Sequence, residues 1–203
     1  MDKKALCILG AILTFAGISI FFSCEKDDIC ADQVITPFFI IRMMDAEDPT
    51  TVDAVSDLQI EYIEENPDQD DDDTTDDAYI KQFVYDSATD TDSITLSLPV
   101  NKTVATYVFY QNYDIDLIEN GVDENGDQIF EEVLNTNTEI DTITFTYAVN
   151  EEYVSRACGF RVTYSNLSVD IETSGDARSF IDSQNIITRI IEDEEQAHVQ
   201  LRH

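Results

Sequence analysis

Apolar and polar residues alternate with a period of two in several parts of the chain, most regularly over residues 94–98, 142–147 and 160–164. Successive side chains of a β-strand point to opposite faces of a sheet, so this alternation predicts strands with one buried face. Other segments rich in β-branched or aromatic residues are further candidate strands. These segments are residues 34–44, 58–63, 79–85, 104–111, 129–134, 167–171, 186–191 and 197–201.

The segments between the candidate strands are rich in Asp, Asn, Ser, Thr and Gly, and nothing beyond residue 23 carries the apolar stripe of a helix. This pattern predicts an all-β fold, an antiparallel β-sandwich of immunoglobulin-like type if a disulfide joins an early strand to a late one. A small β-barrel is the alternative. Residues 34–203 are enough for a single β-sandwich domain. Asn120-Gly121 and Asn125-Gly126 predict turns ahead of the strand at 129–134.

The first residues have the order of an export signal. Lys3 and Lys4 precede an uninterrupted run of 18 apolar or small residues, 5–22. A short positive start followed by such a run is typical of a secretory signal peptide, which we assign to residues 1–23. A retained membrane-spanning anchor over the same run is the alternative.

At Cys24 the chain changes abruptly from apolar residues to the charged segment 25–28, Glu-Lys-Asp-Asp. The junction resembles the lipobox of bacterial lipoproteins, in which the cysteine is acylated and becomes the new N-terminus. This resemblance implies that acyl chains on Cys24 bind the lipid bilayer and that residues 24–33 form a lipidated tether. Several acyl chains anchor a protein stably where a single chain does not.

Two cysteines, Cys30 and Cys158, remain once the leader and the lipid site are set aside. Two thiols in an oxidising envelope suggest one disulfide, with two buried free thiols as the alternative. The two histidines, His198 and His203, follow no zinc-ligand spacing with these cysteines.

Acidic residues outnumber basic ones by 43 to 11, which gives a net charge of −32. This charge argues against binding to nucleic acid or to an anionic membrane surface by electrostatic attraction. Residues 64–78 are the most acidic segment and contain few apolar side chains. Such a segment buries too little surface to offset its ordering entropy, so we predict a disordered insertion.

Asp123, Asn125 and Asp127 alternate like the first ligands of a calcium loop. The match is partial, because an EF-hand loop has glycine where Gln128 stands and a bidentate glutamate where Leu134 stands. A calcium site and a plain solvated turn are therefore both open, and no other cofactor is expected.

The sequence contains no motif of a catalytic site. It has six glycines and no phosphate-binding loop, and a Ser-His-Asp triad would have to recruit His198 from a candidate terminal strand. Paired acids, as a glycosidase needs, are too abundant to be informative. We therefore expect a protein that is not an enzyme.

Several motifs resemble those of lipoproteins from Bacteroidetes. The segment 25–28 resembles an acidic tag for export to the cell surface. Four hydroxyl residues follow an aspartate, as at O-glycosylation sites of that phylum: Thr74, Ser87, Ser93 and Thr142. The spaced cysteines of residues 24–30, together with Ser-Arg-Ala-Cys-Gly-Phe at 155–160, resemble a family of Bacteroidetes lipoproteins of unknown function. This resemblance implies an envelope address and a Cys30–Cys158 disulfide, and no activity.

From these observations we expect a non-catalytic lipoprotein anchored in the outer membrane, on its cell-surface or periplasmic face. It would act by protein contact, as an accessory subunit of an outer-membrane protein or another envelope complex. A glycan- or calcium-binding module is the alternative. Because the chain has no tryptophan, a sugar platform would use tyrosines such as Tyr110 and Tyr113. A hydrolase is the second alternative.

Overall fold

The computed structural model describes residues 36–65, 79–87, 90–122, 128–156, 158–173 and 178–203. Several predicted features lie outside these ranges: the signal peptide, Cys24, Cys30, residues 66–78 of the acidic segment with Thr74, and the calcium candidates Asp123, Asn125 and Asp127. Within the described ranges, no helix has the length and apolar character needed to cross a membrane.

The described part of the chain is all-β. Its strands are β1 (Phe39–Met44), β2 (Leu58–Glu65), β3 (Tyr79–Ser87), β4 (Ser93–Leu96), β5 (Val104–Gln111), β6 (Ile115–Val122), β7 (Gln128–Leu134), β8 (Glu139–Ser155), β9 (Gly159–Thr173), β10 (Ser183–Ile186) and β11 (Val199–Arg202). The predicted fold class is thereby confirmed.

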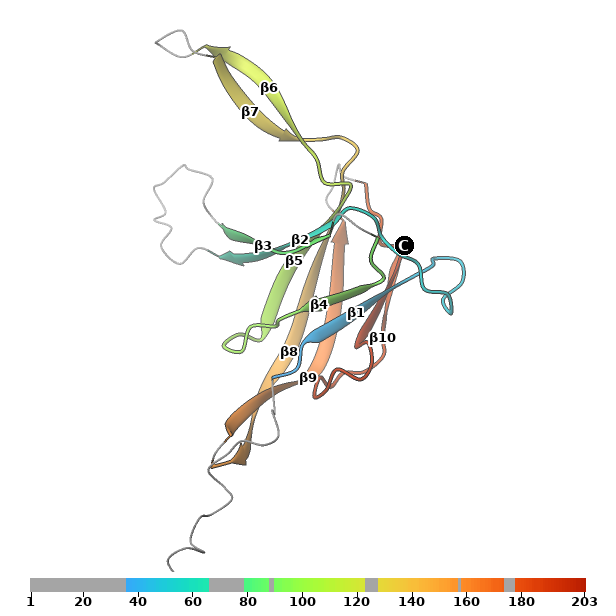
Figure 1. Ribbon diagram of the computed structural model, residues 1–203, viewed down its shortest axis with the longest axis vertical. Coiled ribbons are helices and arrows are strands. Elements are labelled where there is room, and N and C mark those ends of the chain that lie inside the picture. The colour runs from blue at the N-terminus through green and yellow to red at the C-terminus, as the bar shows by residue number, and fades with distance from the viewer. Residues whose placement is uncertain (1–35, 66–78, 88–89, 123–127, 157, 174–177) are drawn as a thin grey trace, which may run out of the picture. The chain divides into compact units, whose positions relative to one another are not determined.

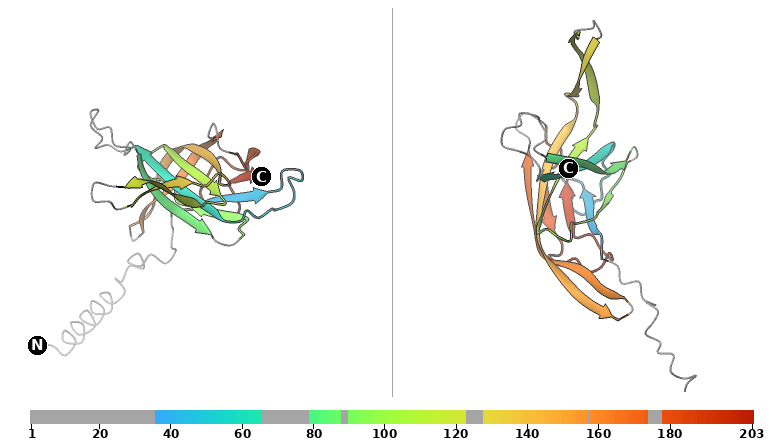
Figure 2. Two further views of the ribbon diagram at one scale, coloured as in Figure 1. Left: turned by 90° about the horizontal axis from the view of Figure 1, so that it is seen from above. Right: turned by 90° about the vertical axis from the view of Figure 1, so that its left-hand side faces the viewer.

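Two sheets make up the sandwich. One has the strand order β10-β11-β1-β4 and the other β3-β2-β5-β8-β9, while β6 and β7 form a separate two-stranded sheet (Figures 1 and 2). The first sheet joins the two ends of the described chain, because β1 pairs in parallel with β11, with Ile41 opposite Val199. The pairs β1–β4, β2–β3, β2–β5 and β5–β8 are antiparallel.

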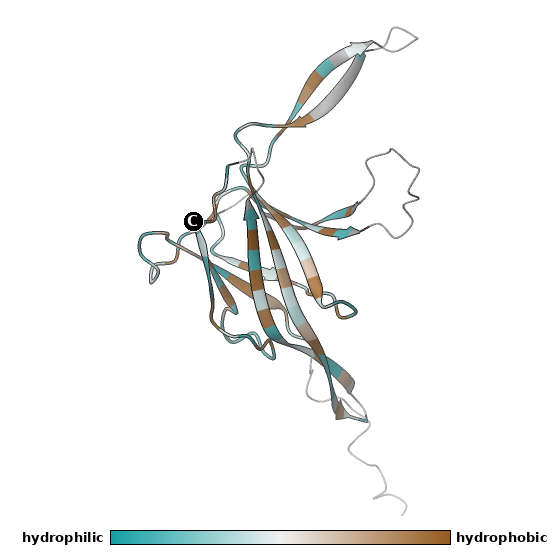
Figure 3. Ribbon diagram, turned by 180° about the vertical axis from the view of Figure 1, so that it is seen from behind, coloured by the Kyte–Doolittle hydropathy of each residue, from teal (hydrophilic) through white to brown (hydrophobic). Residues whose placement is uncertain are grey.

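The core lies between the two sheets. In β8 the residues Ile143, Phe145 and Tyr147 are buried while the threonines between them are more exposed, which is the predicted alternation. Figure 3 shows hydrophobic and hydrophilic residues alternating along the long strands of the second sheet. Phe39 of the first sheet contacts Phe145 of the second edge to face, with ring centroids 4.8 Å apart. Full burial of an aromatic side chain of this size stabilises a fold by roughly 1.5–3 kcal/mol.

Three buried tyrosines fix the segment that follows β4. Tyr107, Tyr147 and Tyr164 donate hydrogen bonds from their hydroxyl groups to the carbonyl oxygens of three successive residues, 97–99, at 2.8–2.9 Å. Burial raises the pKa of all three hydroxyls, because the interior disfavours a charged phenolate. These bonds satisfy carbonyl groups of a segment that belongs to no strand.

The strand predictions fail at identifiable places. Asn120-Gly121 is not a turn but lies within β6, where Gly121 has φ +116° beside a register shift in the β6–β7 pair. Glycine adopts a positive φ in β-bulges as well as in turns, so an Asn-Gly pair also occurs where a strand contains a bulge. Residues 160–164 and 167–171 belong to one strand, β9, and only the first residue of the predicted strand at 186–191 belongs to β10.

The chain divides into two compact units. The larger comprises Thr36–Glu151 and Val162–His203 and contains both sheets and the β6–β7 pair. The described part of the smaller unit is Glu152–Arg161, where the ends of β8 and β9 meet in a hairpin tip. The domain limits predicted at residues 34–203 stay a prediction.

Candidate functional site

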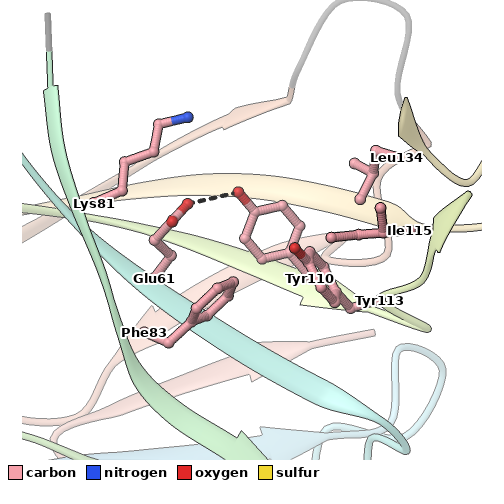
Figure 4. A pocket seen from close by; sticks show the side chains of 7 residues that line it. All are labelled: Glu61, Lys81, Phe83, Tyr110, Tyr113, Ile115 and Leu134. Carbon is pink, nitrogen blue, oxygen red and sulfur yellow. Dashed lines mark hydrogen bonds between the residues drawn. The ribbon is translucent and has the colours of Figure 1, made fainter. Parts of the chain in front are cut away.

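A hollow of about 270 Å³ lies in the larger unit where β2, β3 and β5 meet the base of the β6–β7 pair. We call it the aromatic pocket. It is lined by Glu61 of β2, Lys81 and Phe83 of β3, Tyr110 of β5, Tyr113, Ile115 of β6 and Leu134 of β7. Figure 4 shows these side chains converging on one space.

Three aromatic rings form the wall of the pocket. Tyr110 and Tyr113 meet edge to face with centroids 5.2 Å apart, and Phe83 meets Tyr113 in the same way at 5.6 Å. The ring centroids of Phe83 and Tyr110 are 6.4 Å apart. Edge-to-face pairs of this kind fix the positions of the rings relative to one another. Although it is apolar, Phe83 is 48% exposed.

A bulge in β3 turns Phe83 toward the pocket. Tyr85 pairs with Ile60 and Phe83 pairs with the next residue, Glu61, so Val84 is an extra residue in β3. Two residues apart in a regular strand, Tyr85 and Phe83 would point to the same face. Because of the bulge, Tyr85 packs on the core and Phe83 lies with Glu61 at the pocket.

The pocket has polar groups beside its aromatic wall. Glu61 is buried, and its carboxylate accepts a hydrogen bond from the hydroxyl of Tyr110 at 2.9 Å. Burial, and to a smaller extent the hydrogen bond to this carboxylate, raises the pKa of Tyr110, so the hydroxyl keeps its proton and remains a donor. The exposed Lys81 adds an ammonium group to the lining. A ligand here would meet rings, one carboxylate and one cation.

Several exposed apolar side chains lie on the strands that contribute residues to the pocket. Those of β3 and the β6–β7 pair are Ile80, Phe83, Val84, Ile115, Leu117, Ile118 and Val133, which we call the apolar surface. Among the described residues, β3 pairs only with β2, so it is an edge strand with one row of backbone groups open. Large exposed apolar patches on soluble domains mark contact sites.

Of the residues singled out from sequence, Tyr110 and Tyr113 are brought together in the aromatic pocket. Phe83 and Glu61 were missed, although they belong to the same site. Sequence alternation carried no signal for the bulge that places them there.

His198 is a core residue. It is buried and stacked on Phe39, with ring centroids 5.8 Å apart. Its Nδ1 accepts the backbone N–H of Ile40 at 3.0 Å, so the ring proton is on Nε2, which faces the carbonyl of Asp193 at 3.1 Å. Burial lowers the pKa of the ring. Both nitrogens are held by backbone groups and face no serine, so the triad considered above is not formed by His198.

The described glycosylation candidates lie in strands. Ser93 begins β4, and Thr142 is half-buried near the start of β8, opposite Val108. Ser87 ends β3. The aspartate that precedes Thr142 is Asp141, which is fully buried and bonded to the backbone. Modification of any of the three stays a prediction.

No group of three or more His, Cys, Asp or Glu side chains fit to hold a metal ion occurs in the parts of the chain that the structure describes. The calcium candidates Asp123, Asn125 and Asp127 fall outside those parts. Cys158 is disulfide-bonded. Its predicted partner Cys30 is outside the described ranges, so the pairing stays a prediction.

Residues 74–203 match the model of a family of unknown function, DUF6452. The chain belongs to DUF6452. The match includes β3 through β11 and therefore most of the aromatic pocket. No curated protein and no solved structure matches the chain. The expected membership of a family of unknown function is confirmed to this extent, and DUF6452 brings no activity with it.

Proposed function

We propose that this DUF6452 protein is an envelope lipoprotein of the outer membrane, anchored through acylated Cys24, and that it acts as a non-catalytic accessory subunit by protein contact. The observation that carries the contact role is the aromatic pocket with its apolar surface. Exposed apolar residues on β3 and on the β6–β7 pair do not add to the solubility of a chain of net charge −32, so we attribute them to a contact with another molecule. The anchorage rests on the N-terminal sequence.

The partner binds by adding a strand to the open edge of β3. Strand addition takes its affinity from main-chain hydrogen bonds and its specificity from side-chain pockets beside the edge. The aromatic pocket lies beside β3, and with Phe83 and Tyr113 in its wall it has room for an apolar side chain of the partner. Buried aromatic residues of this kind commonly dominate the free energy of protein contacts.

The test is cross-linked affinity capture of the tagged full-length protein from its native envelope, followed by mass spectrometry. We expect one membrane protein in near-stoichiometric amount, and at least a tenfold loss of it with Phe83→Ser, a drop of about 1.4 kcal/mol in binding free energy. The matched control is Phe38→Ser, because Phe38 is 42% exposed and lies outside the pocket lining. Capture of nothing reproducible, or unchanged capture by Phe83→Ser, would refute the proposal.

A second candidate function is glycan binding at the same pocket. It is favoured by Tyr110 and Tyr113 lying together beside the carboxylate of Glu61, since sugars bind to aromatic faces flanked by hydrogen-bonding groups. A glycan array probed with the purified full-length protein tests it. Binding to one glycan class that is lost with Tyr113→Ala and kept with Phe38→Ser supports this function, and an array without signal excludes it for the glycans present.

A further inference from the structure

The hairpin tip of β8 and β9 exposes two aromatic rings. Within the described residues, Phe160 is the most exposed large apolar side chain, at 66%, and Tyr153 is 58% exposed. The two rings meet edge to face across the hairpin, with centroids 5.3 Å apart. They therefore form a small exposed aromatic cluster on Glu152–Arg161, which we call the tip.

The charge of the tip is opposite to that of the whole chain. Residues 152–161 contain two arginines, Arg156 and Arg161, and one acid, Glu152, so their net charge is +1 against −32 for the chain. Arg161 donates to the carboxylate of Glu152 at 2.6 Å, and Arg156 is exposed. The tip thus presents a cation beside its rings.

Chain length limits how far the tip can lie from the predicted anchor. Cys158 belongs to the tip and is disulfide-bonded. If its partner is Cys30, the five residues 25–29 connect the bridge to Cys24, and the Cα atoms of Cys24 and Cys30 are at most about 22 Å apart when this segment is fully extended. With about 6 Å between the Cα atoms of a disulfide, Cys158 stays within about 28 Å of the acylated residue.

We propose that the tip contacts the phospholipid surface in which Cys24 is anchored, with Tyr153 and Phe160 in the interfacial layer and Arg156 at the headgroup phosphates. Tyrosine is enriched at this layer because its ring is apolar while its hydroxyl tolerates water, and the fully apolar ring of Phe160 gains by leaving water beside it. The tether makes a weak contact effective, since it holds the tip at high local concentration near the bilayer. This inference rests on the lipoprotein anchorage proposed above.

The chain offers a clean probe, because it contains no tryptophan. Phe160→Trp in the full-length acylated protein places a single fluorophore at the tip, and Phe83→Trp is the matched control in the aromatic pocket. Both proteins are reconstituted into liposomes of phosphatidylethanolamine and phosphatidylglycerol that carry brominated acyl chains, which quench at contact distance. We expect blue-shifted, strongly quenched emission from Trp at position 160 and at least threefold weaker quenching at position 83.

Two readouts separate this inference from the anchorage. The mass of the N-terminal peptide reports acylation at Cys24, and flotation reports binding to the liposomes. If the protein is acylated and floats, but position 160 is quenched no more than position 83, the membrane contact of the tip is refuted while the anchorage stands. If Cys24 carries no acyl chains, both proposals fail. A further loss of quenching on adding Tyr153→Ser and Arg156→Ser would tie the contact to the tip.

Discussion

Replacement of Asp141 should strongly destabilise the sandwich. This aspartate of β8 is fully buried, and its carboxylate accepts hydrogen bonds from the hydroxyl of Ser179 at 2.6 Å and from the backbone N–H groups of Phe180 and Ile181 at 3.0 and 2.9 Å. Alanine would leave two buried N–H groups without acceptors. Each unsatisfied buried group costs about 1–3 kcal/mol, so we expect a loss of about 4 kcal/mol in unfolding free energy.

Urea unfolding of the wild type, Asp141→Ala and Asp141→Asn measures this loss, and the asparagine variant should lose about half as much because one acceptor oxygen remains. In a chain of this length, about 4 kcal/mol corresponds to a decrease of roughly 10 °C in Tm. The control is Asp170→Ala, at an exposed position of β9, with an expected change within about 0.5 kcal/mol. An alanine variant within about 1 kcal/mol of the wild type would refute the reasoning.

Three further predictions concern stability. Tyr164→Phe should lower the unfolding free energy by about 1–2 kcal/mol, measured in urea, because a buried carbonyl loses its donor. Burial lowers the pKa of His198 from its ordinary value of 6.5, so the stability that the neutral ring contributes is complete above pH 6.5 and is lost as the pH falls below that value. Between about pH 7.5 and about pH 5, the wild type should therefore lose more unfolding free energy than His198→Asn. Cys30→Ser and Cys158→Ser should each lower the unfolding free energy by up to about 5 kcal/mol, and the double variant should lower it by no more than either single variant. Losses that add up in the double variant would contradict the Cys30–Cys158 pairing.

Sequence alternation predicts strands well where a sheet has one buried and one exposed face. Residues 142–147, predicted from alternation, all lie in β8, where Ile143, Phe145 and Tyr147 face the core and the threonines between them are more exposed. β6 was missed for the opposite reason. Among the described strands it pairs only with β7, and Ile115, Leu117 and Ile118 are all exposed. Because neither face of β6 is buried, its sequence does not alternate between apolar and polar residues.

The strand predicted at 186–191 fails because composition misled the prediction. This segment is rich in isoleucine, yet Ile187 and Ile190 are exposed. The backbone N–H of Ile187 still bonds to the carbonyl of His198, as a strand residue would, but Thr188 then bonds to the backbone of Ile190 in a local turn. A side-chain hydroxyl that bonds to nearby backbone competes with a sheet ladder.

The aromatic pocket shows which part of a site a single sequence can predict. Tyr110 and Tyr113 were singled out by residue type alone, because a sugar platform without tryptophan needs tyrosine. Phe83 depends on a register shift of one residue in β3, and such a shift reverses which side chains face the core. The pattern around Tyr85 is compatible with either register, so only the pairing with β2 could decide it.

The strong acidity of the chain and its apolar surface are compatible for one physical reason. An open edge strand with exposed Ile80, Phe83 and Val84 is a template for pairing with another copy. Two copies of a chain with net charge −32 repel each other, which opposes such pairing, and Lys81 on the same strand is a further obstacle. The charge does not oppose a neutral or basic partner. The edge of β3 can therefore stay open for a partner of different charge while copies of the same chain are kept apart.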